Sequence, residues 1–193
     1  ASQAAMDAIA DHFRCHGQPD QALEWYREAI FCAPMQLHAR QSMAEIHRDV
    51  RNEPDEALKW FLDGIEANPG YAPFYEYVAE SYKEHKNDPA KALEYYKESV
   101  EREPKRVHVY HRMAELCLWR LRAPEQAIQW YTRAAEGEPK AGWVCSRLGE
   151  LHRDYTRNFE ESLKWFEEAT RRADELIASF RPPVSGPSAP TAS

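Results

Sequence analysis

The sequence predicts an all-α protein, an α-solenoid of five antiparallel helix pairs. Three observations support this. The segment Ala57-Leu58-Lys59-Trp60-Phe61 has four relatives at a fixed step of 35 residues, prolines recur at two fixed phases around it, and a second motif recurs at the same spacing between the prolines. A fixed period of this size is typical of a repeat array, in which each unit packs on its neighbours. The five copies of the segment begin at Ala22, Ala57, Ala92, Ala127 and Ser162.

The prolines predict the second helix of each unit. One set stands three residues before the repeated segment, where proline suits the first turn of a helix. The other set follows 15 residues later, where proline cannot continue a helix. Asp88 and Asn158 are expected to cap two of these helices. The prolines are Pro19, Pro54, Pro89 and Pro124 in the first set and Pro34, Pro69, Pro104 and Pro139 in the second, and the second helices are expected over 19–32, 54–67, 89–102, 124–137 and 159–180.

The other motif predicts the first helix of each unit. Met43-Ala44-Glu45-Ile46 is an example, with a small residue between apolar neighbours at helical spacing. First helices are expected over 3–15, 36–50, 71–85, 106–121 and 140–156. The repeat domain therefore covers 1–180, with units of about 3–35, 36–70, 71–105, 106–140 and 141–180. The last helix has no closing proline and is expected to be extended.

Composition limits the kinds of partner and compartment that fit this protein. The tail 181–193 is rich in Pro, Ser and Ala and is expected to be disordered. A net charge of −7 argues against nucleic-acid binding, and no apolar run is long enough for membrane insertion. Four irregularly spaced cysteines predict free thiols in a reducing, cytoplasmic compartment.

Together these motifs resemble tetratricopeptide (TPR) repeats. The resemblance covers residues 3–180, although four of the five units are one residue longer than the family's usual unit. The row of tryptophans before the second aromatic, and Ala134-Ala135-Glu136, are also similar to Sel1-like repeats. Both families imply an α-solenoid, which for TPR proteins is a right-handed superhelix.

The second aromatic of each repeated segment is predicted to lie in the core. Each stands four residues after the small residue at the start of the segment, on the same helical face. They are Tyr26, Phe61, Tyr96, Tyr131 and Phe166. The preceding aromatics point about 100° away and could lie between repeats or partly on the surface.

The resemblance implies that the first helices line a concave groove for a protein or peptide segment. Steps of three and four residues from the small residue of each first helix predict the side chains in that groove. They are Glu45, Tyr77, Glu80, His108, His111, Arg112, Glu115, Trp143, Arg147 and Glu150.

An acid recurs at one position of every first helix: Asp11, Glu45, Glu80, Glu115 and Glu150. One interpretation is an acidic groove that favours a partner with basic residues. The other is structural pairing, of Glu80 with Arg112 and of Glu115 with Arg147. The two interpretations are compatible. Some TPR proteins bind the carboxylate tails of chaperones through Lys, Asn and Arg, and the different residues here predict no such binding.

Catalytic and metal sites have little support. The sequence lacks the common nucleotide-binding, nucleophile-elbow and zinc-protease motifs. His108, His111 and Glu115 share a helical face, as do His12 and His16, but neither set makes a specific metal site. We therefore expect no catalytic residue, no cofactor and no metal.

The leading hypothesis is a non-enzymatic scaffold or adaptor that binds a protein segment in its groove. A second hypothesis is the regulatory or substrate-positioning arm of a larger enzyme. A third is a self-assembling structural scaffold.

Overall fold

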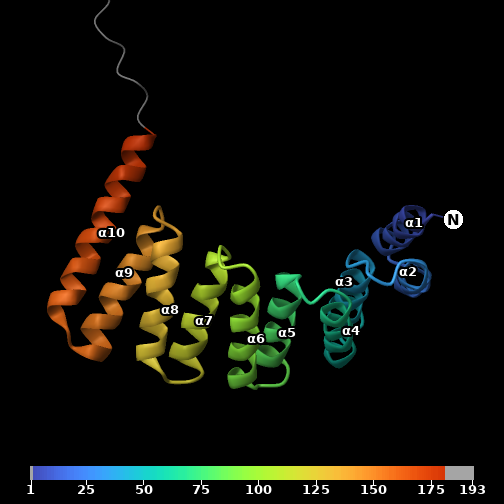
Figure 1. Cartoon of the computed structure of the whole chain (residues 1–193), viewed down its shortest axis with the longest axis horizontal. Coiled ribbons are helices and arrows are strands. Elements are labelled where there is room, and N and C mark those ends of the chain that lie inside the picture. The colour runs from blue at the N-terminus through green and yellow to red at the C-terminus, as the bar shows by residue number, and fades with distance from the viewer. Residues whose placement is uncertain (1, 181–193) are drawn as a thin grey trace, which may run out of the picture. The chain divides into compact units, whose positions relative to one another are not determined.

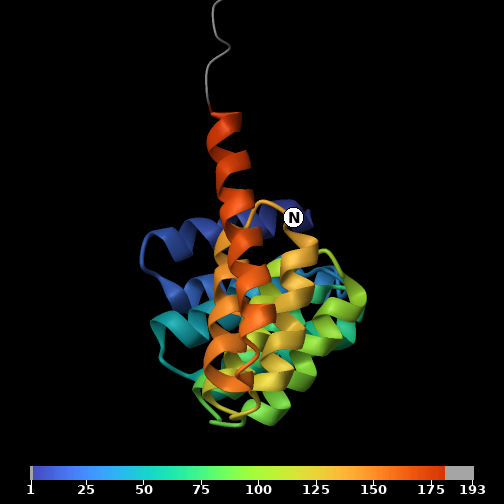
Figure 2. The same cartoon turned by 90° about the vertical axis from the view of Figure 1, so that its left-hand side faces the viewer.

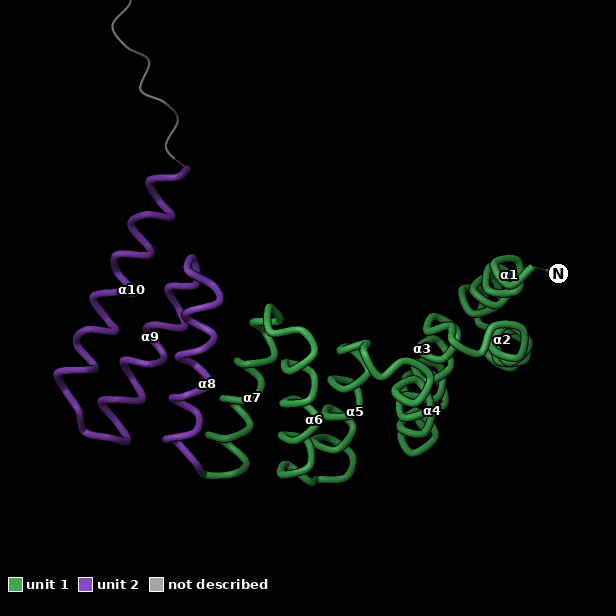
Figure 3. Tube along the Cα trace, in the orientation of Figure 1, with its two compact units in different colours: residues 1–122 green, residues 123–193 purple. Residues whose placement is uncertain are grey.

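The computed structural model of this protein describes residues 2–180, and every regular element in that range is helical. The contacts divide the chain into two compact units, Ala1–Arg122 and Ala123–Ser193 (Figure 3). The division falls between the two helices of the fourth repeat. The expected disordered tail lies outside the described residues, so that prediction stays untested.

The second helices have the bounds that the prolines predict. Each of the first four begins at a proline and ends two residues before the next one. The two expected caps are also confirmed, because Asp88 accepts from the Lys91 amide at 3.0 Å and Asn158 from the Glu161 amide at 3.1 Å. These helices are α2 (Pro19–Cys32), α4 (Pro54–Ala67), α6 (Pro89–Arg102), α8 (Pro124–Gly137) and α10 (Phe159–Ser179).

The first helices differ from expectation at two of their ends. Three of them are regular: α1 (Gln3–Cys15), α5 (Ala72–Glu84) and α7 (Val107–Trp119). The other two, α3 (His38–Glu45) and α9 (Gly142–Leu151), continue as the π-helices η1 (Ile46–Val50) and η2 (His152–Thr156). Both π-helices contain His-Arg-Asp, and in each the arginine bonds to the next aspartate at 2.7 Å. The wider turn lets the amide of Arg51 reach the carbonyl of Ile46, five residues back, at 3.1 Å.

A residue in the left-handed region stands between the two helices of each repeat. Only the first repeat has glycine at this position, the residue type that adopts a positive φ without strain. The five residues are Gly17, Asn52, Asn87, Arg122 and Arg157, with φ between 50° and 71°.

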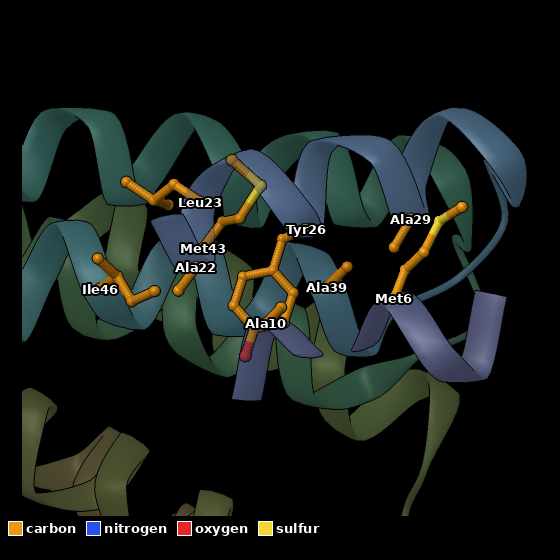
Figure 4. Close-up of a cluster of buried hydrophobic side chains, with 9 residues drawn as sticks. All are labelled: Met6, Ala10, Ala22, Leu23, Tyr26, Ala29, Ala39, Met43 and Ile46. Carbon is orange, nitrogen blue, oxygen red and sulfur yellow. The ribbon is translucent and has the colours of Figure 1, made fainter. Parts of the chain in front are cut away.

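Within the first unit, the core lies where the two helices of a repeat meet the first helix of the next. In the first unit, Tyr26 packs among Ala22, Ala29, Ala39 and Met43, and all five side chains are at most 2% exposed (Figure 4). The core prediction for the aromatics is confirmed for Tyr26, Phe61, Tyr96 and Tyr131, each 0% exposed. Phe166 on α10 is only half-buried.

The last helix is longer than the other second helices. It has 21 residues against 14 in α8, and Figures 1 and 2 show that its final turns extend beyond α9. The expected extension is therefore confirmed. Its exposed apolar side chains include Leu163, Leu176 and Ile177.

Candidate functional site

Glu45 is held by a neighbouring repeat. Arg14 of α1 donates to Glu45 Oε2 at 3.0 Å, and the Gln41 amide donates to Oε1 at 2.9 Å. The Glu45 side chain stays 28% exposed. Ion pairs that remain partly exposed contribute about 0–1 kcal/mol. Glu45 thus links α3 to α1 and is partly neutralised.

Tyr77 lies beside Glu45 and is fixed by an aromatic stack. Its ring lies 4.8 Å from that of Phe61 on α4, and its hydroxyl accepts from Gln41 at 3.2 Å. Burial, and then the charge of Glu45, raises the pKa of Tyr77. Tyr77 therefore stays neutral at physiological pH and can offer a hydroxyl to a ligand.

Glu80 has the densest set of partners among the acids. Lys83 lies 2.6 Å away, Arg112 of α7 donates at 2.7 Å, and the hydroxyl of Tyr96 also donates to this carboxylate. Burial of Glu80 opposes its charge, but the hydrogen bonds from Lys83 and Tyr96 outweigh burial, and its pKa lies below the ordinary value. The expected pair of Glu80 with Arg112 is confirmed.

The sequence did not predict that core tyrosines donate hydrogen bonds to two of the recurring acids. In the first repeat, Tyr26 donates to Asp11, as Tyr96 donates to Glu80 in the third. Both acids lie one helix away from the buried ring, at the same position of the repeat. The available signal was the choice of Tyr rather than Phe at the core position, since a buried hydroxyl needs a partner.

Sequence reasoning also missed a buried carboxylate. Glu76 of α5 is 6% exposed and accepts from Arg106, from Ser99 at 3.2 Å and from His108 at 2.9 Å. His108 itself is 52% exposed. Helical spacing alone does not distinguish a buried acid from a solvated one, and no sequence signal identified Glu76.

A hollow lies between the ends of α5 and α7 in the first unit. Two of the predicted residues, Arg112 and Glu115, line it. Glu115 is 47% exposed and lies 3.8 Å from His111. Trp119 contributes an indole that is 53% exposed. The full lining is Lys83, Glu84, Arg112, Glu115, Leu116, Trp119 and Arg120.

Three predicted residues lie in the second unit. Trp143 is 53% exposed, and Arg147 donates to Glu150 of the same helix at 2.9 Å. That hydrogen bond is the main cause that raises the pKa of Arg147. The expected pair of Glu115 with Arg147 would join the two units and stays a prediction.

Among the described residues, no group of three or more His, Cys, Asp or Glu side chains is placed to hold a metal ion. In the same range, no helix is both long and apolar enough to cross a membrane. The imidazole rings of His12 and His16 lie with their centroids 4.1 Å apart and are tilted by 33° relative to each other.

The fold is similar to those of several solved repeat proteins. The MamA protein matches at 14% identity with a TM-score of 0.71, covering 95% of this chain and 98% of that one. A MamA fragment from Desulfovibrio magneticus RS-1 matches at 13% identity with a TM-score of 0.65, covering 90% and 96%. YrrB, a TPR protein with an unusual peptide-binding site, matches at 16% identity with a TM-score of 0.63, covering 92% and 90%. These likenesses confirm the α-solenoid expected from the sequence.

A comparison with curated proteins found no match. The family model of the Sel1 repeat matches residues 15–30, 83–103, 110–138 and 144–174, which together make about half of the chain. The expected TPR-like repeat thus carries the Sel1 character that its tryptophan row indicated. The chain belongs to the Sel1 repeat family.

Proposed function

We propose that this protein is a non-enzymatic scaffold that holds a segment of another protein along the face of its first helices. The repeat architecture supports an interaction role, since helix pairs stacked in this way present a long surface to a ligand. YrrB, which has a similar fold, is described as having a peptide-binding site. The ten groove residues expected from the sequence are the proposed contacts.

The hollow between α5 and α7 is the observation that carries the proposal. It combines an exposed indole with charged groups, which is a common composition for an anchor pocket that receives one partner side chain. Trp119 offers an apolar surface, and Arg112 and Glu115 offer polar atoms. We propose that a single side chain of the bound segment enters this hollow.

The lining of the hollow carries charges of both signs, and Glu115 is the acid that we propose pairs with a basic side chain. Lys83 is bonded to Glu80 and to Glu84, at 2.6 and 3.2 Å, and Arg112 is bonded to Glu80. Glu115 has a weaker contact, 3.8 Å from His111. A lysine or arginine of the partner could therefore stack on Trp119 and pair with Glu115. This supports the preference for basic residues suggested by the acids that recur on the first helices.

Selection from a random peptide library tests this proposal. We expect the selected peptides to be enriched in Lys or Arg. Glu115→Lys should weaken their binding at least tenfold, which corresponds to about 1.4 kcal/mol. Glu125→Lys is the matched control, because Glu125 is exposed on α8 and lies outside the hollow.

Selected peptides without basic residues, or equal binding by the parent and Glu115→Lys, would contradict the proposal. Glu45 and Glu80 are unsuitable first targets, because their ion pairs also join helices of the fold.

We further propose a cytoplasmic location, which is supported by four free cysteines.

A further inference from the structure

The outer face of α10 is exposed where the equivalent faces of earlier second helices are covered. Leu163 is 59% exposed, whereas Leu23 and Leu58, at the same position of the first and second repeats, are 2% and 7% exposed. Leu23 packs with Met43 and Ile46, and Leu58 packs with Phe74 and Val78. In both cases the covering side chains come from the first helix of the next repeat, so a first helix is the kind of element that fits this face.

A hollow of about 460 Å³ continues this face between α9 and α10. Its lining includes Phe166, Ala169 and Thr170 of α10 and Trp143 of α9. Phe166 and Ala169 correspond to Phe61 and Gly64 in the second repeat. There, the ring of Phe61 stacks on Tyr77 at 4.8 Å, and the ring of Phe74 lies against Gly64. The hollow therefore occupies the place where a following first helix would pack.

The helix α1 presents a complementary face. Ala5 and Ala8 are exposed, and Ile9 beside them is half-buried. In the repeat register these residues correspond to Ala39, Ser42 and Met43 of α3, which are 0%, 2% and 0% exposed.

The junction between α2 and α3 shows how such faces fit. Ala39 and Met43 belong to the same buried cluster as Tyr26 and Ala29 of α2 (Figure 4). Phe166 and Ala169 of α10 are the counterparts of Tyr26 and Ala29, and Leu163 beside them is 59% exposed. Both sides of this internal junction therefore recur at opposite ends of the described chain, where no following or preceding repeat covers them.

We propose that α1 of a second copy packs on the hollow between α9 and α10, so that copies associate head to tail. The internal junction would then be repeated between molecules. An ion pair would accompany it, because Arg153 and Asp11 stand at the positions of Arg14 and Glu45, which are bonded at 3.0 Å inside the first unit. A head-to-tail contact joins two different faces, so it can extend into chains of molecules.

This interface is separate from the anchor hollow, and Trp143 is the proposed groove contact that also lines this interface. It uses the outer faces of α1, α9 and α10, whereas the anchor hollow lies between α5 and α7. Glu115→Lys in the anchor hollow should therefore leave self-association intact, and changes at Leu163 or Ala5 should leave the anchor hollow intact.

Sedimentation of the full chain over a concentration series tests the interface. We expect the average mass of the parent to rise with concentration. Leu163→Glu should disrupt the face on α10, and Ala5→Glu should disrupt the face on α1. Each variant alone should have the mass of a single chain. Because each variant keeps one intact face, an equimolar mixture should form a complex of two chains and stop there. Phe31→Glu and Ala90→Glu are matched controls, since both residues are exposed and lie on neither face.

Three outcomes would overturn the proposal. In the first, the parent keeps the mass of one chain at all concentrations. In the second, the parent associates but neither variant changes its mass. In the third, both variants are single chains and their mixture forms no complex. Circular dichroism of each variant shows whether a loss of self-association reflects unfolding. A complex in the mixture is independent evidence that both variants are folded.

Discussion

The hydroxyl of Tyr96 on α6 donates a hydrogen bond to Glu80 on α5, so a core residue of the second helix fixes an acid on the face of the first. The same relationship joins Tyr26 to Asp11 in the first repeat. The acid row was open to two interpretations, and for these two acids the structure shows a structural contact. Glu80 also has the expected ion pair with Arg112.

Tyr96→Phe should reduce stability without disturbing the packing. Phe61 occupies the same position in the second repeat and is fully buried, so the ring alone fits the core. Removing one hydrogen bond to a charged group costs about 1.5–3 kcal/mol, and the remaining bonds to Lys83 and Arg112 should keep the loss near the lower value. Urea unfolding measures it. Tyr95→Phe is the control, because Tyr95 stacks on Tyr82 through its ring. Equal midpoints for Tyr96→Phe and the parent would show that the bond adds no stability.

The stability of the first unit should fall in acid partly through Glu80. Its pKa is lower in the folded protein than the ordinary value of 4.5. The stabilisation from its charge is therefore fully present above the pKa of the unfolded chain. It is lost as the pH falls through the lower folded value. Thermal unfolding of Glu80→Gln and of the parent should differ most near neutral pH and converge in acid. Glu101→Gln, at an exposed position, is the control. A difference that stays constant with pH would contradict the assignment.

The fold was predictable where prolines mark the helix ends. The bounds of α2, α4, α6 and α8 agree with prediction, because proline acts through its own ring on the local backbone. The π-helices η1 and η2 were not predictable, since nothing in the apolar pattern distinguishes five residues of wide turn from α-helix.

One ion pair among the candidate residues was predictable, but their other contacts were not. Periodicity places Glu80 and Arg112 on adjacent first helices, and the ion pair follows from that. Burial of Glu76 depends on the approach of Arg106 from the next repeat, and this contact between repeats has no local signature in the sequence.

Gln36→Arg should stabilise the junction between the first two repeats. Asp7 Oδ1 and Gln36 Oε1 are buried and accept no hydrogen bond from any described residue, although the Gln36 amide donates to Asp7 Oδ2. Glu76 and Arg106 stand at the equivalent positions two repeats later and form an ion pair. Replacing the amide with a guanidinium would supply donors for Asp7. It should raise stability by about 1 kcal/mol.

A double-mutant cycle distinguishes this explanation from a general effect of charge. The gain from Gln36→Arg should disappear in a chain that also carries Asp7→Asn, because the carboxylate that receives the guanidinium is then absent. Chemical denaturation of the four proteins gives the coupling energy. A gain that persists in the Asp7→Asn background would show that the introduced guanidinium acts elsewhere.

Arg122→Gly should also stabilise the protein. Arg122 has φ of 55°, in the left-handed region where a Cβ atom costs about 1–2 kcal/mol. Glycine avoids that cost but loses more freedom on folding, so the net gain should be about 0.5–1 kcal/mol. The first repeat already has Gly17 at the corresponding position, with φ of 71°. Arg122→Ala is the control, because it removes the long side chain but keeps Cβ and should give no gain. If alanine and glycine raised the melting temperature equally, relief of backbone strain would not be the cause.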